Sequence, residues 1–288
     1  MANLIINSHK FSFVVNSLRQ FFLSKKYVEV HTQNRLSILA ACEDPSTISI
    51  YNYAASHWPL PQTGQMWLEY ELLRDPKPPG YFCVSTSYRN EPDPIPGRHD
   101  IIFPMFEFEL KGDLNEMQNM EGELLEHLGY GKKNSFPEEN YGVLAKKLGV
   151  KEISSKEEIS LYKKDGHNVF FLKNFPEYTS PFWNMKRNDD GKTAKKIDVI
   201  MSGMETIGSA ERSIDIDDMR DRFKTISGGM YSKLLYNLFG RERVDREMDE
   251  FLSHKFFTRS GGGIGVTRLI RSMELSGLLP KEVCDARK

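Results

Sequence analysis

Charged and aromatic side chains gather around a proline-rich loop in the first half of the chain. Arg89 and Glu91 stand two residues apart, so on an extended strand both side chains point to one face. Arg98 and His99 follow the loop, and Phe103 begins the next strand-like run. A guanidinium group can bind phosphate oxygens as a fork, an aromatic ring can stack on a base, and a carboxylate can accept from an amine. These residue types predict a nucleotide-binding face, and a solvated face with cross-strand ion pairs is the alternative.

A second candidate segment lies between Gly203 and Arg212. Glu205 and Arg212 are seven residues apart with small residues between them, which leaves room for a ligand against the backbone. The Glu205 carboxylate suits a hard cation such as Mg²⁺, which takes oxygen ligands and bridges phosphates. Taken alone, the segment is equally compatible with a surface turn.

A third candidate is the glycine run from Gly261 to Gly265, ahead of a helix. Glycines allow a ligand to approach the backbone closely, and Arg268, one turn into that helix, would direct a cation towards such a ligand. The run fits neither GxxxxGK[ST] nor a GxGxxG that follows a strand. Phosphate-loop and Rossmann-type sites are therefore disfavoured.

Hydrophobic periodicity predicts the elements that would carry these residues. The runs 81–88 and 101–110 flank the Pro/Gly-rich loop 91–97 and predict a long antiparallel hairpin. Helices are expected at 11–25, 65–73, 114–128, 244–252 and 266–276, and further strands at 27–32 and 197–201. Strands joined by hairpins, with helices grouped rather than alternating, predict an α+β fold. Residues 129–180 are lysine-rich and weakly patterned, which favours a solvated insertion over a partner-binding surface.

Composition excludes several classes of protein. Lys and Arg number 39 against 40 for Asp and Glu, a net charge of −1, so no broad basic surface for nucleic acid is expected, although a local patch remains open. No apolar run approaches the roughly 20 residues that span a bilayer, and the N-terminus does not read as a signal peptide. The three cysteines and seven histidines lack the spacing of a disulfide framework or a zinc site. We therefore expect a cytoplasmic globular protein without a membrane partner.

Taken in order, these segments resemble the three motifs of class II aminoacyl-tRNA synthetases. The helix and strand at 11–34 resemble motif 1, with Gln33 at the position of the usual proline. The segment 88–103 resembles motif 2, and Gly263–Arg268 matches the GxGxxR of motif 3. The resemblance covers nearly the whole chain.

This resemblance implies a definite architecture. The class II core is a mainly antiparallel sheet flanked by helices. It implies one catalytic domain over residues 1–288, with a helical or irregular insertion at about 113–195. It also implies a homodimer formed through motif 1.

Two further segments resemble the aspartyl and asparaginyl subgroup. Residues 63–69 (TGQMWLE) are similar to the SGQLxLE of asparaginyl-tRNA synthetases. Residues 98–109 are similar to their RHLAEFWMVEPE, with Ile102 where the family usually has Glu. Glu205 to Arg212 keeps the family's spacing of seven. Aspartyl enzymes place a lysine where this chain has Leu68, so the resemblance favours asparagine or another neutral side chain over aspartate.

By resemblance, the chain is an ATP-dependent ligase that forms an aminoacyl-adenylate from asparagine or aspartate and passes it to an acceptor. Catalysis would rest on positioning and charge stabilisation. The implied catalytic residues are Arg89 and Arg268; the ATP-binding residues are Arg89, Glu91, Arg98, His99, Phe103, Gly265 and Arg268; the amino-acid-binding residues are Gln65, Glu107 and Arg212; and the Mg²⁺ ligands are Glu205 and Ser209, with Glu107 as a further candidate.

The acceptor stays open at this point. The family's anticodon-binding barrel is not expected, because motif 1 begins within the first dozen residues, so we expect a small amine or another non-tRNA nucleophile rather than tRNA. An asparagine synthetase that uses ammonia, a true asparaginyl-tRNA ligase and a non-catalytic synthetase paralogue are the alternatives. The complete set of Arg89, Glu91 and Arg268 argues against the paralogue.

Overall fold

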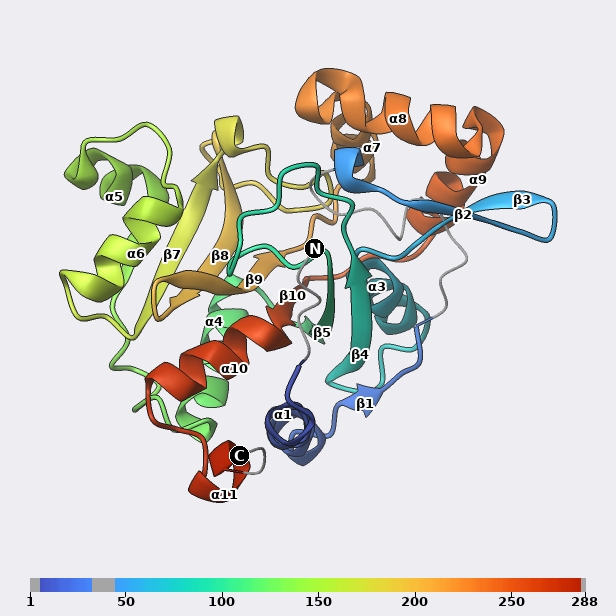
Figure 1. Ribbon diagram of the computed structural model, residues 1–288. Helices are drawn as coiled ribbons and strands as arrows, with labels where there is room; N and C mark the ends of the chain where they lie inside the picture. The colour runs from blue at the N-terminus through green and yellow to red at the C-terminus, as the bar shows by residue number, and fades with distance from the viewer. Residues whose placement is uncertain (1–5, 33–44, 286–288) are drawn as a thin grey trace.

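A computed structural model of the chain describes residues 6–32 and 45–285, so the expected motif 1 position Gln33 lies outside the described residues. Within them an eight-stranded sheet runs in the order β1-β4-β5-β10-β9-β8-β7-β6 (Figure 1). Its strands are β1 (Val28–Glu29), β4 (Gly80–Tyr88), β5 (Ile102–Lys111), β10 (Arg259–Gly265), β9 (Met204–Glu211), β8 (Thr193–Met201), β7 (Val169–Pro176) and β6 (Glu138–Asn140). The pairs at the two ends are parallel and those between are antiparallel, which confirms the predicted α+β fold.

Three helices cover one face of the sheet: α1 (Ser8–Ser24), α4 (Leu114–His127) and α10 (Val266–Leu275). Their apolar stripes bury a core around Phe22, Phe82, Phe106 and Phe108. The helix predicted at 11–25 begins three residues earlier, because the Asn7 side chain accepts from the first backbone amides and caps the helix. After α10 comes the short α11 (Lys281–Asp285).

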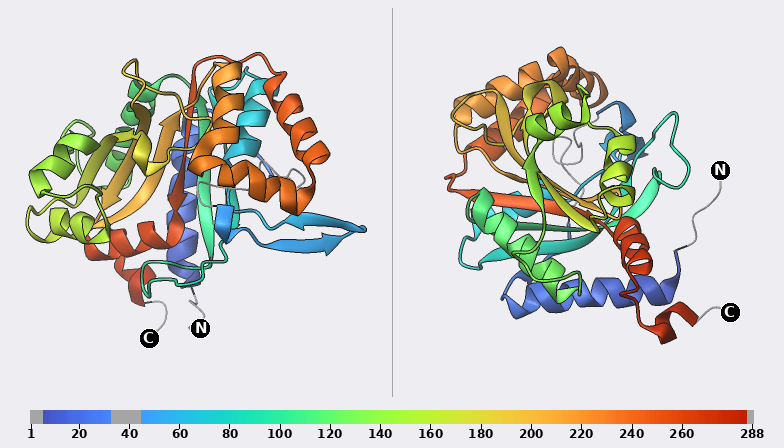
Figure 2. Two further views of the ribbon diagram at one scale, coloured as in Figure 1. Left: turned by 90° about the horizontal axis from the view of Figure 1, so that it is seen from above. Right: turned by 90° about the vertical axis from the view of Figure 1, so that its left-hand side faces the viewer.

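The opposite face carries α3 (Gln65–Arg74), α7 (Ile216–Thr225), α8 (Met230–Phe239) and α9 (Arg241–Leu252), packed around the fully buried Trp183. Three short 3₁₀ helices lie at Pro45–Thr47, Glu177–Thr179 and Ile226–Gly229. A hairpin of β2 (Ile50–Tyr53) and β3 (Ser56–Pro59) projects from the body (Figure 2). Among the described helices, none combines the length and the apolar character that crossing a bilayer requires.

Residues 129–180 show little hydrophobic periodicity in the sequence, yet they form regular secondary structure. They form β6, α5 (Tyr141–Leu148), α6 (Ser155–Lys163) and β7, and bury a separate small core at the end of the sheet. Helix α6 packs against the turn between β8 and β9, where Gly203 has a φ of +79°. A Cβ at Gly203 would lie 3.1 Å from the Cα of Ile159 in α6. A glycine is needed at this turn for both reasons.

The glycine run predicted ahead of a helix is itself the strand β10, near the middle of the sheet. Gly261 pairs with Glu109 on one side and Ala210 on the other, and Gly263 pairs with Glu107 and Gly208. Most residues of β10 are glycines, which have no side chain. The sequence therefore shows no alternation of buried and exposed side chains that would predict a strand. The absence of side chains opens space: a Cβ at Gly261 would lie 1.8 Å from Glu109 Oε1.

We expect Gly261→Ala to lower the free energy of unfolding by about 1–3 kcal/mol, because the added methyl group must displace the buried Glu109 carboxylate. Gly142→Ala is the matched control, since a Cβ there meets nothing within 4 Å. In helix α5 alanine should be neutral or favourable by up to about 1 kcal/mol. Urea unfolding measures both variants, and equal stabilities would contradict the expectation.

Candidate active site

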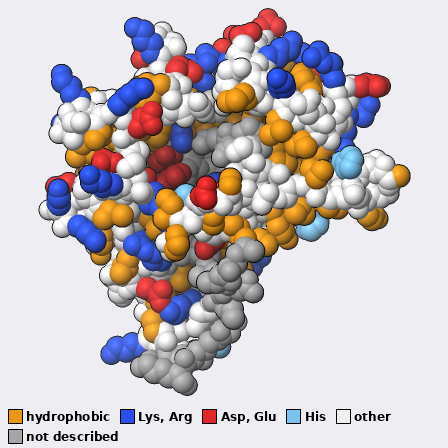
Figure 3. Space-filling model, turned by 45° about the horizontal axis from the view of Figure 1, so that its top comes forward, with side chains coloured by type: hydrophobic (Ala, Val, Ile, Leu, Met, Phe, Trp, Pro, Cys, Tyr) orange, Lys and Arg blue, Asp and Glu red, His pale blue; other side chains and the backbone are white. Residues whose placement is uncertain are grey.

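A cavity of about 350 Å³ opens on the sheet face that carries α3. Figure 3 shows this face hollowed, with acidic side chains inside the hollow. The walls come from the β4–β5 loop, α3, the segment 182–185, β8, β9 and the start of α10. Every residue that the sequence analysis assigned to the site lines this cavity: Gln65, Arg89, Glu91, Arg98, His99, Phe103, Glu107, Glu205, Ser209, Arg212, Gly265 and Arg268.

The floor of the cavity is bare backbone. Gly208 and Gly263 are paired across β9 and β10, with Asp198 of β8 next to Gly208 and Glu107 of β5 next to Gly263. A Cβ at Gly263 would lie 2.8 Å from Gln65 Nε2. The strands β8 and β5 on either side each carry an acidic residue beside this floor, which only glycines leave open.

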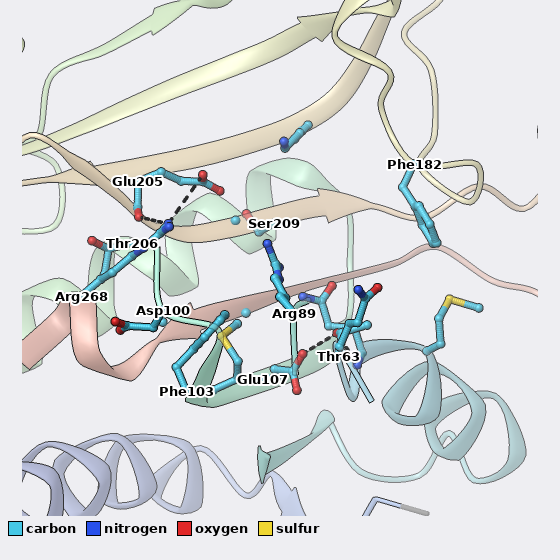
Figure 4. Close-up of a pocket in the computed structure, with 18 of the residues that line it drawn as sticks. Thr63, Arg89, Asp100, Phe103, Glu107, Phe182, Glu205, Thr206, Ser209 and Arg268 are labelled. Atoms are coloured by element: carbon cyan, nitrogen blue, oxygen red, sulfur yellow. Dashed lines mark hydrogen bonds and ion pairs between the residues drawn. The ribbon is translucent and has the colours of Figure 1, made fainter. Parts of the chain in front are cut away.

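One part of the cavity suits a base and its phosphates. The Arg89 guanidinium lies over the Phe103 ring, 5.7 Å from its centroid. His99 Nδ1 lies 2.7 Å from Glu91 Oε2. Figure 4 shows Arg89 projecting between Arg268 and Glu205 at one end and Phe182 at the other. A planar aromatic ring beside a guanidinium group can hold a nucleotide through stacking and charge together.

Arg268 closes this part of the cavity. Its Nη1 donates to the Glu205 carbonyl oxygen at 2.8 Å and lies 3.9 Å from Glu205 Oε2. The neighbouring Thr267 hydroxyl donates to Asp100 Oδ2 at 3.0 Å. The start of α10 is thus tied both to β9 and to the β4–β5 loop, which fixes the position of the Arg268 side chain.

Sequence reasoning missed Glu158 of helix α6. Its Oε2 accepts from Arg98 Nη2 at 2.6 Å and from the Glu205 backbone amide at 3.1 Å. The two paired side chains are only 14% and 13% exposed, and burial raises the pKa of Glu158 while Arg98 opposes that rise. No sequence signal points to this contact, because Glu158 lies in the weakly patterned stretch and 60 residues from Arg98.

Asp198 was also missed, and with Glu205 it forms a carboxylate pair. Asp198 Oδ1 and Glu205 Oε1 lie 3.6 and 3.1 Å from the point where a Gly208 Cβ would stand. The signal was present, since a strand, a tight turn at Gly203 and a return strand bring the two acids together. Among the described residues no group of three or more His, Cys, Asp or Glu side chains is arranged to hold a metal ion. A pair still fits Mg²⁺, which commonly takes one or two carboxylates plus water and phosphate oxygens.

The side chain of Ser209, which the sequence analysis named as a Mg²⁺ ligand, does not point into the cavity. Its neighbour Gly208 faces the cavity, so the Ser209 side chain points to the opposite face of β9. Its hydroxyl donates to the Ile197 carbonyl oxygen at 3.3 Å. A hydroxyl in this position is turned away from the Asp198–Glu205 pair.

The far end of the cavity is built on a buried ion network. Arg212 Nε donates to Glu109 Oε1 at 3.0 Å, and Arg212 Nη2 donates to Gln65 Oε1 at 2.9 Å. Glu69 accepts from Arg259 at 3.0 and 2.7 Å. The charged side chains of Arg212, Glu109, Glu69 and Arg259 are at most 3% exposed. Buried charges persist only when paired in this way, so the network holds Arg212 in a single orientation.

Two buried acceptors at this end have no hydrogen-bond partner among the described residues. They are Asn184 Oδ1 and Glu109 Oε2. Asn184 donates its amide to Glu69 Oε1, which orients its oxygen. A buried acceptor without a donor is unfavourable, so a ligand that brings an N–H group would be favoured here.

Glu107 is held by the protein's own donors. Its carboxylate accepts from the Gly64 amide at 2.8 Å and from the hydroxyls of Thr63 and Ser85. Burial raises the pKa of Glu107, and these hydrogen bonds counter the rise. The group therefore anchors the loop that leads into α3. Of the three departures noted above, Gln33 lies outside the described residues, Leu68 is fully buried in the core and Ile102 is 57% exposed outside the cavity.

Comparison with known proteins gives a consistent picture. The family model of tRNA synthetases class II (D, K and N) matches residues 3–276. The asparagine–tRNA ligase of Cytophaga hutchinsonii is 32% identical over 76 residues, which is 26% of this chain and 16% of that protein. The structure of asparaginyl-tRNA synthetase from Pyrococcus horikoshii complexed with asparaginyl-adenylate superposes with a TM-score of 0.74 at 20% identity, covering 91% of this chain and 64% of that one. Asparaginyl-tRNA synthetase from Entamoeba histolytica in complex with asparaginyl-adenylate gives 0.71 at 18%, covering 93% and 63%.

This chain thus spans just under two thirds of the length of those two structures.

The Glu158 contact predicts a local effect on the β4–β5 loop. We expect Glu158→Ala to speed tryptic cleavage after Arg98 by about fivefold or more, because removing one member of a buried pair frees the other. Mass spectrometry of early fragments measures this rate relative to cleavage after the exposed Arg220.

Glu274→Gln is the control, since it removes an exposed ion pair with Lys10 far from the loop. An unchanged ratio in Glu158→Ala would show that Glu158 does not hold the loop.

Proposed function

Because the chain belongs to the class II tRNA synthetases of the D, K and N type, we propose that its cavity joins an amino acid to AMP at the expense of ATP. The observation that carries the proposal is one cavity with two chemically different ends. Arg89, Phe103 and Arg268 surround one end, and the fixed Arg212 forms the other. A glycine floor connects them, so two substrates can meet above it.

In the proposed reaction, an α-carboxylate oxygen of the amino acid attacks the α-phosphorus of ATP. The bond from that phosphorus to the bridging oxygen breaks, and pyrophosphate leaves with the bonding electrons. Arg89 would neutralise the charge that builds on the α-phosphate, which is where a fixed cation lowers the barrier most. No covalent bond to the protein forms, so positioning carries the remaining acceleration.

The other side chains at this end would hold the nucleotide. Phe103 and Arg268 would enclose the adenine ring, and Glu91 would accept from its amino group. Arg98 and His99 would meet the terminal phosphate, for which each must leave its present carboxylate partner. Nucleotide binding is thus proposed to exchange ion pairs within the protein for pairs with phosphate.

Asp198 and Glu205 would hold Mg²⁺ when it is bound. The ion would supply positive charge to the leaving phosphates. An oxygen of each carboxylate lies within 4 Å of the point where a Gly208 Cβ would stand, which is the support for this assignment.

At the other end we propose asparagine as the substrate, with aspartate as the alternative. Two carboxyl groups, Glu109 and Glu69, already lie beside Arg212, so a substrate carboxylate would have to share this cation with both. A carboxamide could accept from Arg212 and donate to Asn184 Oδ1, a buried acceptor without a partner among the described residues. Such unsatisfied acceptors favour an amide over a carboxylate.

This proposal predicts a sharp effect at Arg89. Pyrophosphate exchange should depend on asparagine in a panel of the common amino acids, and Arg89→Ala should reduce it by about 10²–10³-fold. Arg220→Ala, which removes an exposed pair with Asp249, is the control and should keep the parent rate. Exchange in Arg89→Ala within threefold of the parent would exclude the role, and exchange with no amino acid would exclude the function.

The proposal also predicts whether the adenylate needs tRNA to form, and which kind of molecule accepts the amino acid. Described residues of this chain line both ends of the cavity, so the adenylate should form without tRNA. Near-neutral net charge gives little attraction for a phosphate backbone, so a small amine or another non-tRNA nucleophile is proposed as the acceptor.

Hydroxylamine should therefore trap the activated amino acid as a hydroxamate in the absence of RNA. The same assay with ammonium instead of hydroxylamine, and with aspartate as the amino acid, tests for an asparagine synthetase. Efficient, RNase-sensitive charging of one species in total tRNA would instead identify an asparaginyl-tRNA ligase.

A further inference from the structure

Lys196 of β8 lines the cavity, and no role above uses it. Its side chain is 13% exposed and lies against the Phe175 ring, with Nζ 4.5 Å from the ring centroid. Nζ is also 3.5 Å from Asp198 Oδ1. That distance exceeds a normal N–H···O hydrogen bond, so the contact is one of charge rather than a tight bond.

This lysine completes a group of four neighbouring charged side chains, of which Lys196, Glu205 and Arg268 line the cavity. Arg268 stands 3.9 Å from Glu205, the Glu205 and Asp198 carboxylates converge on Gly208, and Lys196 stands beside Asp198. Two carboxylates are therefore flanked by a cation on each side. A divalent ion entering between them must overcome repulsion from both.

The phosphates of ATP would change this balance. A lysine ammonium is a compact charge on a flexible stem and a common phosphate ligand. Lys196 needs only to turn within the cavity that it already lines to exchange Asp198 for a phosphate oxygen. Asp198 would then be available to a metal ion, whose charge the phosphates also attract.

We propose that Lys196 is the resident cation of the metal site: it balances Asp198 in the free protein and moves to phosphate when ATP binds. Metal binding is thereby made conditional on the nucleotide. This inference rests on the proposed nucleotide and magnesium site. The simpler alternative is that Lys196 only neutralises a buried carboxylate.

Direct binding measurements separate the two. Mn²⁺, used as a probe for Mg²⁺, is titrated into the nucleotide-free protein and followed by electron paramagnetic resonance. ATP binding is measured by calorimetry in EDTA. We expect Lys196→Met to tighten Mn²⁺ binding about fivefold or more and to weaken metal-free ATP binding about tenfold. Lys196→Arg should stay near the parent in both.

Lys173→Met is the control, since Lys173 pairs with Glu138 on the same half of the sheet but does not line the cavity. Unchanged Mn²⁺ and ATP affinities in Lys196→Met, or weaker Mn²⁺ binding, would overturn the proposal, as would a parent protein that binds neither. If the shifts occur as expected but no amino acid supports pyrophosphate exchange, the inference stands and the proposed adenylation fails.

Discussion

The site depends on a strand without side chains at the centre of the sheet. β10 lies between β5 and β9, and its glycines leave the space above it to side chains from the neighbouring strands. Glu109 of β5 occupies the volume above Gly261 and reaches Arg212 at the end of β9. Any larger residue at Gly261 would separate these charges, and any larger residue at Gly263 would close the floor of the cavity. The buried ion network and the open floor thus have one common cause.

Around this floor the chain buries several charged side chains, and most of them contact a group of opposite charge. Arg212 and Arg259 meet Glu109 and Glu69, Arg98 meets Glu158, and Glu211 is held by Lys186 and Lys195. Such pairs add little net stability, because desolvation offsets much of the attraction. Their effect is on position: Arg212 is already oriented in the cavity wall before a ligand arrives, whereas Arg98 is held by a partner that it must exchange for phosphate in the proposed reaction.

The sequence was informative where chemistry is local. Arg89 and Glu91 both line the cavity as predicted, although they follow the end of β4 and do not lie on a strand as the periodicity argument assumed. The hairpin, the long helices and the α+β fold followed from hydrophobic spacing. Contacts between distant segments left no such signal: Glu158 reaches Arg98 only because α6 packs on the Gly203 turn. The strand β10 was hidden because glycines carry no pattern. Ser209 shows a third limit, since spacing from Glu205 does not reveal which way a residue faces once β8 and β9 shift register.

The place of β10 has a consequence for how the chain reaches its structure. Among the described strands it comes last in sequence, yet it is inserted between β5 and β9. Until it arrives, the sheet exists as two separate halves, each with an open hydrogen-bonding edge. During synthesis from the N-terminus, the ribosome must release more than 250 residues before those edges can be joined. Long-range pairing of this kind folds slowly and leaves edges exposed to other chains. We therefore expect the halves to form first, and the cavity to appear only when β10 joins them.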